Sequence, residues 1–182
     1  MAKFIVVDET RCLACKQCVT ECAVAHSDSE SVMDAVVEGK RLISRVHVEP
    51  GGADVAIPMQ CRHCEDAPCM MVCPTEAISR CDSDGPVLIA ADQCIGCRSC
   101  LLACPFGIIE MSFDGAAAVK CDLCIQRTSQ GEEPACVSAC PTKAIRYCEL
   151  DDMAKARRRE AALKLTSNAA SGSESRNGPD SD

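Results

Sequence analysis

Most of the cysteines in this chain fall into four groups of four, and their spacing limits the possible folds more than any other feature. Groups one and three share the spacing C-x2-C-x2-C-x3-C, group two has four residues in its middle gap, and group four has eleven. A proline follows the last cysteine of groups two, three and four, where the text runs CPTEAI, CPFGII and CPTKAI. The groups therefore form an internal repeat. In order along the chain they are Cys12, Cys15, Cys18, Cys22; Cys61, Cys64, Cys69, Cys73; Cys94, Cys97, Cys100, Cys104; and Cys121, Cys124, Cys136, Cys140.

The spacing within each group indicates iron–sulfur clusters. Three thiolates in C-x2-C-x2-C can surround one face of a 4Fe-4S cube, whereas a cysteine three residues further on points away from it. In the bacterial ferredoxin arrangement that last cysteine ligates the second cluster of a pair, and a proline turns the chain after it. Four groups of this kind predict four 4Fe-4S clusters.

The expected ligand sets follow from which groups pair. Only 20 residues separate Cys73 from Cys94, so groups two and three pair locally, and groups one and four pair across the whole chain. This arrangement nests one ferredoxin-like unit inside another. The expected sets, with all sixteen cysteines as iron ligands, are Cys12, Cys15, Cys18 with Cys140; Cys61, Cys64, Cys69 with Cys104; Cys94, Cys97, Cys100 with Cys73; and Cys121, Cys124, Cys136 with Cys22.

Other cysteine chemistry fits this pattern less well. Structural zinc sites usually combine two separated C-x2-C knuckles. A c-type haem needs C-x-x-C-H, and no cysteine here is directly followed by histidine. A thioredoxin-like C-x-x-C does not come in runs of three or four. A structural metal module without a redox role stays open as an alternative.

The composition agrees with an interior filled by something other than large side chains. The 182 residues include one Tyr, three Phe and no Trp, so a core of this length lacks its usual bulky fillers. The formal charge of −8 argues against a nucleic-acid partner. No signal-peptide pattern precedes the first cysteine, and no apolar run approaches the ~20 residues of a membrane span. We therefore expect a cytoplasmic protein with reduced thiols and no membrane span.

Between the cysteine groups the sequence predicts short strands and turns, and hence an α+β fold. Residues rich in β-branched or aromatic side chains predict strands at 3–7, 41–48, 86–90 and 108–113. Asp114-Gly115 predicts a hairpin turn after the last of these. Each cysteine group is expected to end in a short helical turn, which the following proline cuts.

The predicted domain plan separates the cysteine groups from the C-terminal part. Residues 1–150 form a polyferredoxin with an inner module at about 61–113 and an outer module at about 1–60 plus 114–150. The remainder, 151–182, consists of a helix of about four turns at 151–165 and a polar tail, expected to be disordered, from residue 166.

Two cysteines and three histidines stand outside the ligand sets. Cys81 and Cys148 each lie eight residues after the last cysteine of a group, at the end of a repeated strand. Equivalent positions suggest equivalent packing, so both are expected to be small buried thiols. His26, His47 and His63 are not expected to be ligands, because sixteen cysteines already close four clusters.

The long gap in group four, residues 125–135, is predicted to be an insertion within one ligand set. Loop-closure cost rises by only about 0.6 kcal/mol per doubling of length, so the motif tolerates the insertion. Gly131 and Pro134 are expected to shape a polar lip beside the last cluster. Shielding that cluster from water and docking a partner are both open as roles for the lip.

These residues resemble a known family. The first group, then CRHCEDAPCMMVCP, CIGCRSCLLACPFG and KCDLC-x11-CVSACPTKAI, in this order, are similar to the four-cluster iron–sulfur subunits of complex oxidoreductases. That family includes the iron–sulfur subunits of dimethyl sulfoxide reductase, formate dehydrogenases, formate hydrogenlyase and carbon monoxide dehydrogenase. The resemblance covers about residues 1–150 and implies two pseudo-symmetric bacterial-ferredoxin-like modules. Ala23 departs from the pattern, because it replaces the proline after Cys22, and a different turn is expected there.

The resemblance also implies a function. The chain is expected to be a non-catalytic subunit that relays single electrons from or to the metal active site of a large catalytic metalloenzyme subunit. A second electron carrier or a flavin subunit would be the other partner. Candidate partner enzymes are tungsten- or molybdenum-dependent aldehyde or aromatic acyl-CoA oxidoreductases, formate dehydrogenase, hydrogenase and carbon monoxide dehydrogenase. A free soluble polyferredoxin without a permanent partner is the alternative.

Overall fold

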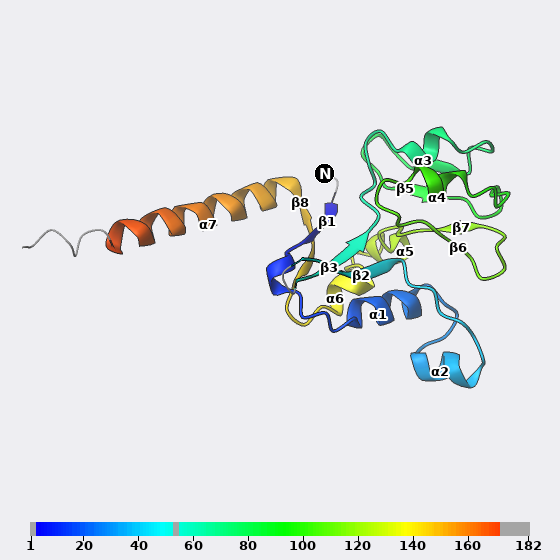
Figure 1. Cartoon of the computed structure of the whole chain (residues 1–182), viewed down its shortest axis with the longest axis horizontal. Coiled ribbons are helices and arrows are strands. Elements are labelled where there is room, and N and C mark those ends of the chain that lie inside the picture. The colour runs from blue at the N-terminus through cyan, green and yellow to red at the C-terminus, as the bar shows by residue number, and fades with distance from the viewer. Residues whose placement is uncertain (1–2, 53–54, 172–182) are drawn as a thin grey trace, which may run out of the picture. The chain divides into compact units, whose positions relative to one another are not determined.

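The structure is a computed structural model that describes residues 3–52 and 55–171. Within these residues the fold is α+β, as expected, and consists of short helices, two-stranded sheets and one long C-terminal helix (Figure 1). The elements in chain order are β1 (Lys3–Val7), η1 (Glu9–Arg11), α1 (Gln17–Ala25), α2 (Val32–Val37), β2 (Val46–Pro50), β3 (Ala56–Gln60), α3 (Pro68–Met71), β4 (Ile78–Arg80), β5 (Val87–Ile89), α4 (Ser99–Ala103), β6 (Glu110–Met111), β7 (Ala118–Val119), α5 (Ile125–Thr128), α6 (Ala135–Ser138), β8 (Ile145–Glu149) and α7 (Leu150–Ser171).

The chain divides into two compact units. One spans Ile5–Tyr147 and contains all four cysteine groups, and the other includes α7. No helix in the described part of the chain is long and apolar enough to cross a membrane. The expected inner module and most of the expected outer module fall within Ile5–Tyr147, so this division does not separate them, and they stay a prediction.

Two hydrophobic clusters form the core of the unit that spans Ile5–Tyr147. The first joins an early segment of the chain to a late one and consists of Cys18, Cys22, Val46, Cys136, Val137, Cys140, Ala144 and Ile145. The second draws on the middle of the chain and consists of Ala67, Cys69, Ile78, Val87, Cys100, Ile109 and Ala118. Neither contains an aromatic residue among its buried members. Cysteines and small aliphatic side chains fill the interior instead.

The repeat seen in the sequence is also a repeat in the backbone. The residue just before the second cysteine has a positive φ in every group: Ala14, His63, Gly96 and Leu123. A left-handed residue at this position turns the chain sharply between two cysteines. A helix later in each group carries the third cysteine.

The turn after the last cysteine recurs in three groups and is missing from the first. Glu76, Gly107 and Lys143 each lie three residues after a group's last cysteine, and each has a positive φ. Their N–H groups donate to the carbonyl oxygens of Cys73, Cys104 and Cys140 at 3.2–3.3 Å. In group one, by contrast, α1 continues through Ala23 to Ala25. The expected departure is therefore confirmed, since no proline stops this helix.

The predicted strands are correct in part. β1 matches the prediction, β5 lies within 86–90, and β6 pairs with β7 as the predicted hairpin (Figure 1). The predicted strand at 41–48 is wrong over its first half, because β2 begins only at Val46. The N–H of Arg45 points instead to Cys22 Sγ, at 3.3 Å. β2 pairs with β3, a strand that the sequence analysis missed because Pro58 interrupts its pattern; a two-stranded sheet tolerates this residue at its edge.

The structure confirms the helices predicted within the cysteine groups and corrects the predicted end of the C-terminal helix. Short helices α1, α3, α4 and α6 carry the third cysteine of each group, as predicted. The C-terminal helix is confirmed but runs from Leu150 to Ser171, beyond the predicted end at residue 165. The predicted disorder is therefore wrong for residues 166–171, which continue the helix. The rest of the predicted tail lies outside the described residues.

The prediction of two equivalent buried thiols is wrong. Cys81 is exposed, directly after β4, whereas Cys148 is half-buried within β8. Strand β4 ends at Arg80, one residue before Cys81, and a turn to Gly85 follows. Equivalent sequence positions thus have different surroundings because the strands differ in length.

Candidate iron–sulfur sites

The expected ligand sets give four places in the structure to examine. We name them site 1 (Cys12, Cys15, Cys18, Cys140), site 2 (Cys61, Cys64, Cys69, Cys104), site 3 (Cys94, Cys97, Cys100, Cys73) and site 4 (Cys121, Cys124, Cys136, Cys22). Each contains three cysteines of one group and the last cysteine of another.

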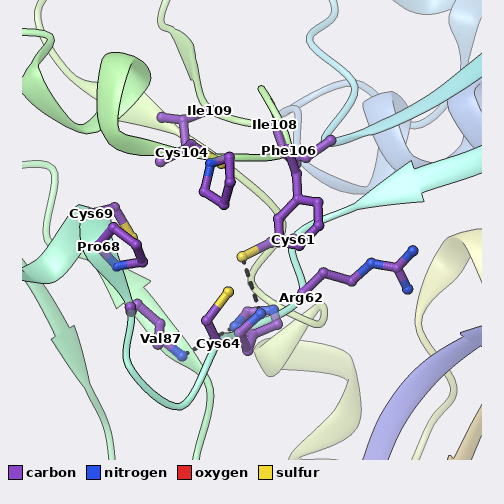
Figure 2. A pocket seen from close by; sticks show the side chains of 13 residues that line it. Cys61, Arg62, Cys64, Pro68, Cys69, Val87, Cys104, Phe106, Ile108 and Ile109 are labelled. Carbon is purple, nitrogen blue, oxygen red and sulfur yellow. Dashed lines mark hydrogen bonds between the residues drawn. The ribbon is translucent and has the colours of Figure 1, made fainter.

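Site 2 surrounds an apolar pocket (Figure 2). Cys61 and Cys64 lie on the turn after β3, Cys69 lies on α3, and Cys104 reaches the pocket from the end of α4. The other walls are mostly carbon and include Pro68, Val87, Phe106, Ile108 and Ile109. Sulfur donors that converge on an apolar space are suited to soft metal centres such as iron–sulfur clusters.

His63 leaves an unpaired donor next to this pocket. The N–H of Val87 donates to His63 Nδ1 at 3.1 Å, so the ring proton must reside on Nε2. Burial, together with the Lys120 ammonium, lowers the pKa of His63 to about 3, and the ring is therefore neutral. Nε2 is buried and has no partner among the described residues. A sulfide or thiolate sulfur of a bound cluster would accept a hydrogen bond from this N–H, so the pocket fits the group that its cysteines imply.

Site 3 lies at the surface. Cys97 is exposed, whereas Cys100 on α4 is buried. The backbone N–H of Ser99 lowers the pKa of Cys97, and the nearby sulfur of Cys73 opposes this shift, so the last cysteine of group two reaches group three. Gly96 is required here, because it has a φ of +67° and a Cβ would lie 3.0 Å from the carbonyl oxygen of Gly115.

Site 1 also brings its four cysteines together across the chain. Burial raises the pKa of Cys18 to about 11, and the neighbouring sulfurs of Cys15, Cys140 and Cys12 add to the shift. Cys140 lies shortly after the end of α6. Helix α6 packs against α1, which carries Cys18. Cys15 is exposed, like its counterpart Cys97 in site 3.

Site 4 is the most deeply enclosed of the four. All four of its cysteines are buried. Burial raises the pKa of Cys136 far above its usual value, and the sulfurs of Cys121, Cys22 and Cys124 raise it further. Cys22 comes from α1, so the last cysteine of group one lies among the cysteines of group four.

The raised pKa values have a consequence for metal binding. Burial raises the pKa of Cys121 to about 12 and that of Cys18 to about 11, so without metal these thiols keep their protons at neutral pH. Iron binds the thiolate form. Iron binding at sites 1 and 4 would therefore release protons, and the metal would have to offset the cost of burying the charge.

Charged side chains flank site 4. His26 Nδ1 donates to the carbonyl oxygen of Cys22 at 2.7 Å, and Nε2 lies 3.0 Å from Asp122 Oδ1. Burial opposes the charge, but Asp122 and the sulfurs of Cys124 and Cys22 raise the pKa of His26 to about 12. Arg45 Nη1 donates to Asp122 Oδ2 at 2.6 Å. Despite partial burial, these two cations hold the pKa of Asp122 well below its usual value. We call these three residues the charged network.

A polar cavity opens beside the charged network. It has a volume of about 250 Å³ and is lined by His26, Asp122, Cys124 and Arg127, among others. Site 4 is therefore bordered by polar groups with access to solvent, in contrast to the apolar pocket of site 2. His26, Asp122 and Cys124 also lie close enough together to hold a metal ion. Because Cys124 belongs to the expected set of site 4, this group does not constitute a separate site.

Cysteines of neighbouring sites influence one another electrostatically, and these influences link the sites in one order. Besides burial, sulfurs of a neighbouring site raise the pKa of a cysteine in three cases, and each case joins a different pair of sites. The pairs are Cys100 with Cys69, Cys121 with Cys61, and Cys136 with Cys18. They connect site 3 to site 2, site 2 to site 4, and site 4 to site 1. Of the sixteen expected ligands only Cys97 and Cys15 are exposed, and they belong to the two terminal sites, 3 and 1.

The sequence analysis missed the histidines around the sulfurs. It set His26 and His63 aside because neither is needed as a ligand, yet both lie beside expected ligands. A signal for His63 was present, since it stands between two cysteines. For His26 the signal was weaker, because its partner Asp122 lies 96 residues away.

Comparison with known proteins agrees with this donor chemistry. The family model described as "4Fe-4S dicluster domain" matches residues 53–150, about half of the chain.

Three relatives match over most of the chain. The "Iron-sulfur protein" of Rhodospirillum rubrum is 43% identical, covering 87% of this chain and 90% of its own. The "Electron transport protein HydN" of Escherichia coli K12 is 36% identical, covering 90% and 99%. The "Thiosulfate reductase electron transfer subunit PhsB" of Salmonella typhi is 37% identical, covering 80% and 74%.

Proposed function

Because the chain belongs to the family of 4Fe-4S dicluster iron–sulfur proteins that carry electrons, we propose that it is a four-cluster subunit. In this role it relays single electrons between the metal active site of a partner oxidoreductase and a second electron carrier in the cytoplasm. Iron–sulfur electron transfer is common to the relatives. Beyond it, we propose the number of clusters, the cysteines that bind them and the class of partner.

The observation that carries the proposal is the mixed origin of the cysteines around each site. At site 2, Cys104 of group three lines the same pocket as three cysteines of group two. The same exchange brings Cys73 toward Cys97, Cys140 toward Cys18, and Cys22 toward Cys136. This supports crossed ligation within two pseudo-symmetric modules, each holding two clusters.

The clusters would supply one-electron chemistry, and the protein sets their distances, surroundings and insulation. The electrostatic influences between sulfurs of different sites support the linear order site 3, site 2, site 4, site 1. Cys97 and Cys15 would then mark the two ends where electrons are exchanged with partners, while the buried cysteines of site 4 insulate the middle. No residue of the chain is assigned a catalytic role.

The partner class rests on the relatives. One is named as the electron transfer subunit of a thiosulfate reductase. For this chain we propose a large metalloenzyme partner from the same broad class: tungsten- or molybdenum-dependent aldehyde or aromatic acyl-CoA oxidoreductases, formate dehydrogenase, hydrogenase or carbon monoxide dehydrogenase. A flavin subunit or a soluble carrier would be the second partner.

Anaerobic purification from native cells tests the proposal. We expect a brown complex with about 16 iron atoms and a similar amount of sulfide per chain, as four cubes require. A larger subunit with its own metal should copurify. A colourless chain that contains zinc would contradict the redox role. A brown chain that elutes alone would instead support a free polyferredoxin and contradict the subunit role.

A further inference from the structure

Lys120 is a buried cation with no carboxylate partner. It directly follows β7, and the residue is only 4% exposed. Its Nζ donates to the carbonyl oxygens of Val87 and Cys121, the latter at 3.2 Å. No carboxylate within residues 3–52 and 55–171 forms an ion pair with it. Two carbonyl oxygens satisfy hydrogen bonds but do not neutralise the charge.

A buried charge of this kind needs a compensating charge nearby. An isolated ammonium in an apolar interior is strongly unfavourable unless it is paired. The closest acidic group in sequence, Asp122, is already bound by two cations, His26 and Arg45. The described interior therefore carries an excess of positive charge, although the whole chain has a net charge of −8.

Lys120 lies where site 2 and site 4 meet. Its acceptor Val87 lines the pocket of site 2, and its acceptor Cys121 belongs to site 4. The ammonium also acts on the site 2 side: burial raises the pKa of Cys69, and Lys120 opposes that rise. The same pair of sites is joined by the neighbouring sulfurs of Cys61 and Cys121.

We propose that Lys120 is the shared counter-cation of the clusters at sites 2 and 4 and raises the reduction potential of both. The inference rests on the proposed function. Four thiolates give each cluster a net negative charge, and one added electron increases it by one without making or breaking a bond. Lys120 therefore stabilises the reduced form more than the oxidised form. The electron arrives from one neighbouring site and leaves to the next. Lys120 therefore favours the reduced state of the two central clusters while the electron passes through them.

The test compares charge with size at this position. Lys120→Met removes the charge and keeps the length of the side chain, while Lys120→Arg keeps the charge. Lys40→Met is the control, since Lys40 is half-exposed and pairs with Glu38. Each variant is purified anaerobically with its clusters, iron and sulfide are quantified, and the clusters are titrated by EPR. Serine variants of Cys64 and Cys124 identify the signals of sites 2 and 4.

We expect Lys120→Met to lower the equilibrium constant for reduction of both central clusters at least tenfold, which corresponds to about 59 mV for one electron. Sites 1 and 3, Lys120→Arg and Lys40→Met should keep the wild-type potentials. Unchanged central potentials in a fully loaded Lys120→Met would overturn the inference.

A loading defect also decides the question. If Lys120→Met does not hold the central clusters while Lys120→Arg does, the charge is what they require, in agreement with the inference. If both variants lose them equally, the size of the side chain matters instead, and the inference is wrong. A wild-type chain without iron would overturn the proposed function itself, a result distinct from all of these.

Discussion

Sites 2 and 4 have corresponding positions in the repeat and opposite surroundings. The pocket of site 2 is apolar, and its histidine, His63, is neutral with an unpaired Nε2 proton. Site 4 has buried sulfurs, but its histidine, His26, is positively charged and belongs to a network with Asp122 and Arg45. A polar cavity of about 250 Å³ adjoins it. The same kind of donor set is thus placed in two different electrostatic environments.

The difference originates in a few positions between and after the cysteines. Between the first two cysteines, site 2 has Arg62 and His63 where site 4 has Asp122 and Leu123. Arg62 is exposed and points away from the sulfurs (Figure 2), whereas Asp122 binds two cations. The spacing of cysteines therefore predicts the ligands, and the residues around them would adjust the potential of each proposed cluster.

The largest expected effect comes from removing the cysteine that crosses between groups. Cys104→Ser should remove the cluster of site 2, and Cys22→Ser that of site 4, each with about a quarter of the iron. Iron analysis and EPR of anaerobically purified variants measure this. Cys81→Ser is the control, because Cys81 is exposed and outside the groups. If Cys22→Ser removed the signals of site 1 and spared those of site 4, the crossed assignment would be wrong.

A smaller effect is expected from breaking the charged network. Asp122→Asn leaves His26 and Arg45 without their shared partner, and should destabilise the region by roughly 1–3 kcal/mol. The temperature at which cluster absorbance is lost on anaerobic heating should fall. Arg62→Gln, at the matching position of site 2, should leave it unchanged. An equal loss in both variants would show that the network makes no special contribution to site 4.

The smallest effect separates the two histidines. His26→Gln removes a positive charge beside site 4, so we expect its potential to fall by tens of millivolts, about 60 mV for each 1.4 kcal/mol of stabilisation lost. His63→Gln removes only a neutral donor, and site 2 should change less. EPR-monitored titration of the two variants measures both shifts. Larger shifts for His63→Gln would reverse the comparison and point to a direct bond from its ring to the cluster.

Much of the local structure follows from the sequence because it depends on neighbouring residues. β1, the β6–β7 hairpin and the short helices in each cysteine group were predictable from patterns within about ten residues. The strand predicted at 41–48 begins too early because Arg45 donates hydrogen bonds to Cys22 and Asp122, both distant in sequence, instead of pairing with a neighbouring strand. Cys81 was mistaken because equal spacing after a cysteine does not ensure equal burial.

The sequence by itself determined the donor chemistry and the repeat. Closely spaced cysteines, with a tight turn before the second one of each group, can present their sulfurs to one metal centre without help from the rest of the fold. Only the tertiary structure decided what surrounds those sulfurs. His26 meets Asp122 across 96 residues, and Lys120 meets Val87 across 33. Such contacts form only when distant segments pack together, and burial then turns ordinary side chains into the charges and donors that distinguish one site from another.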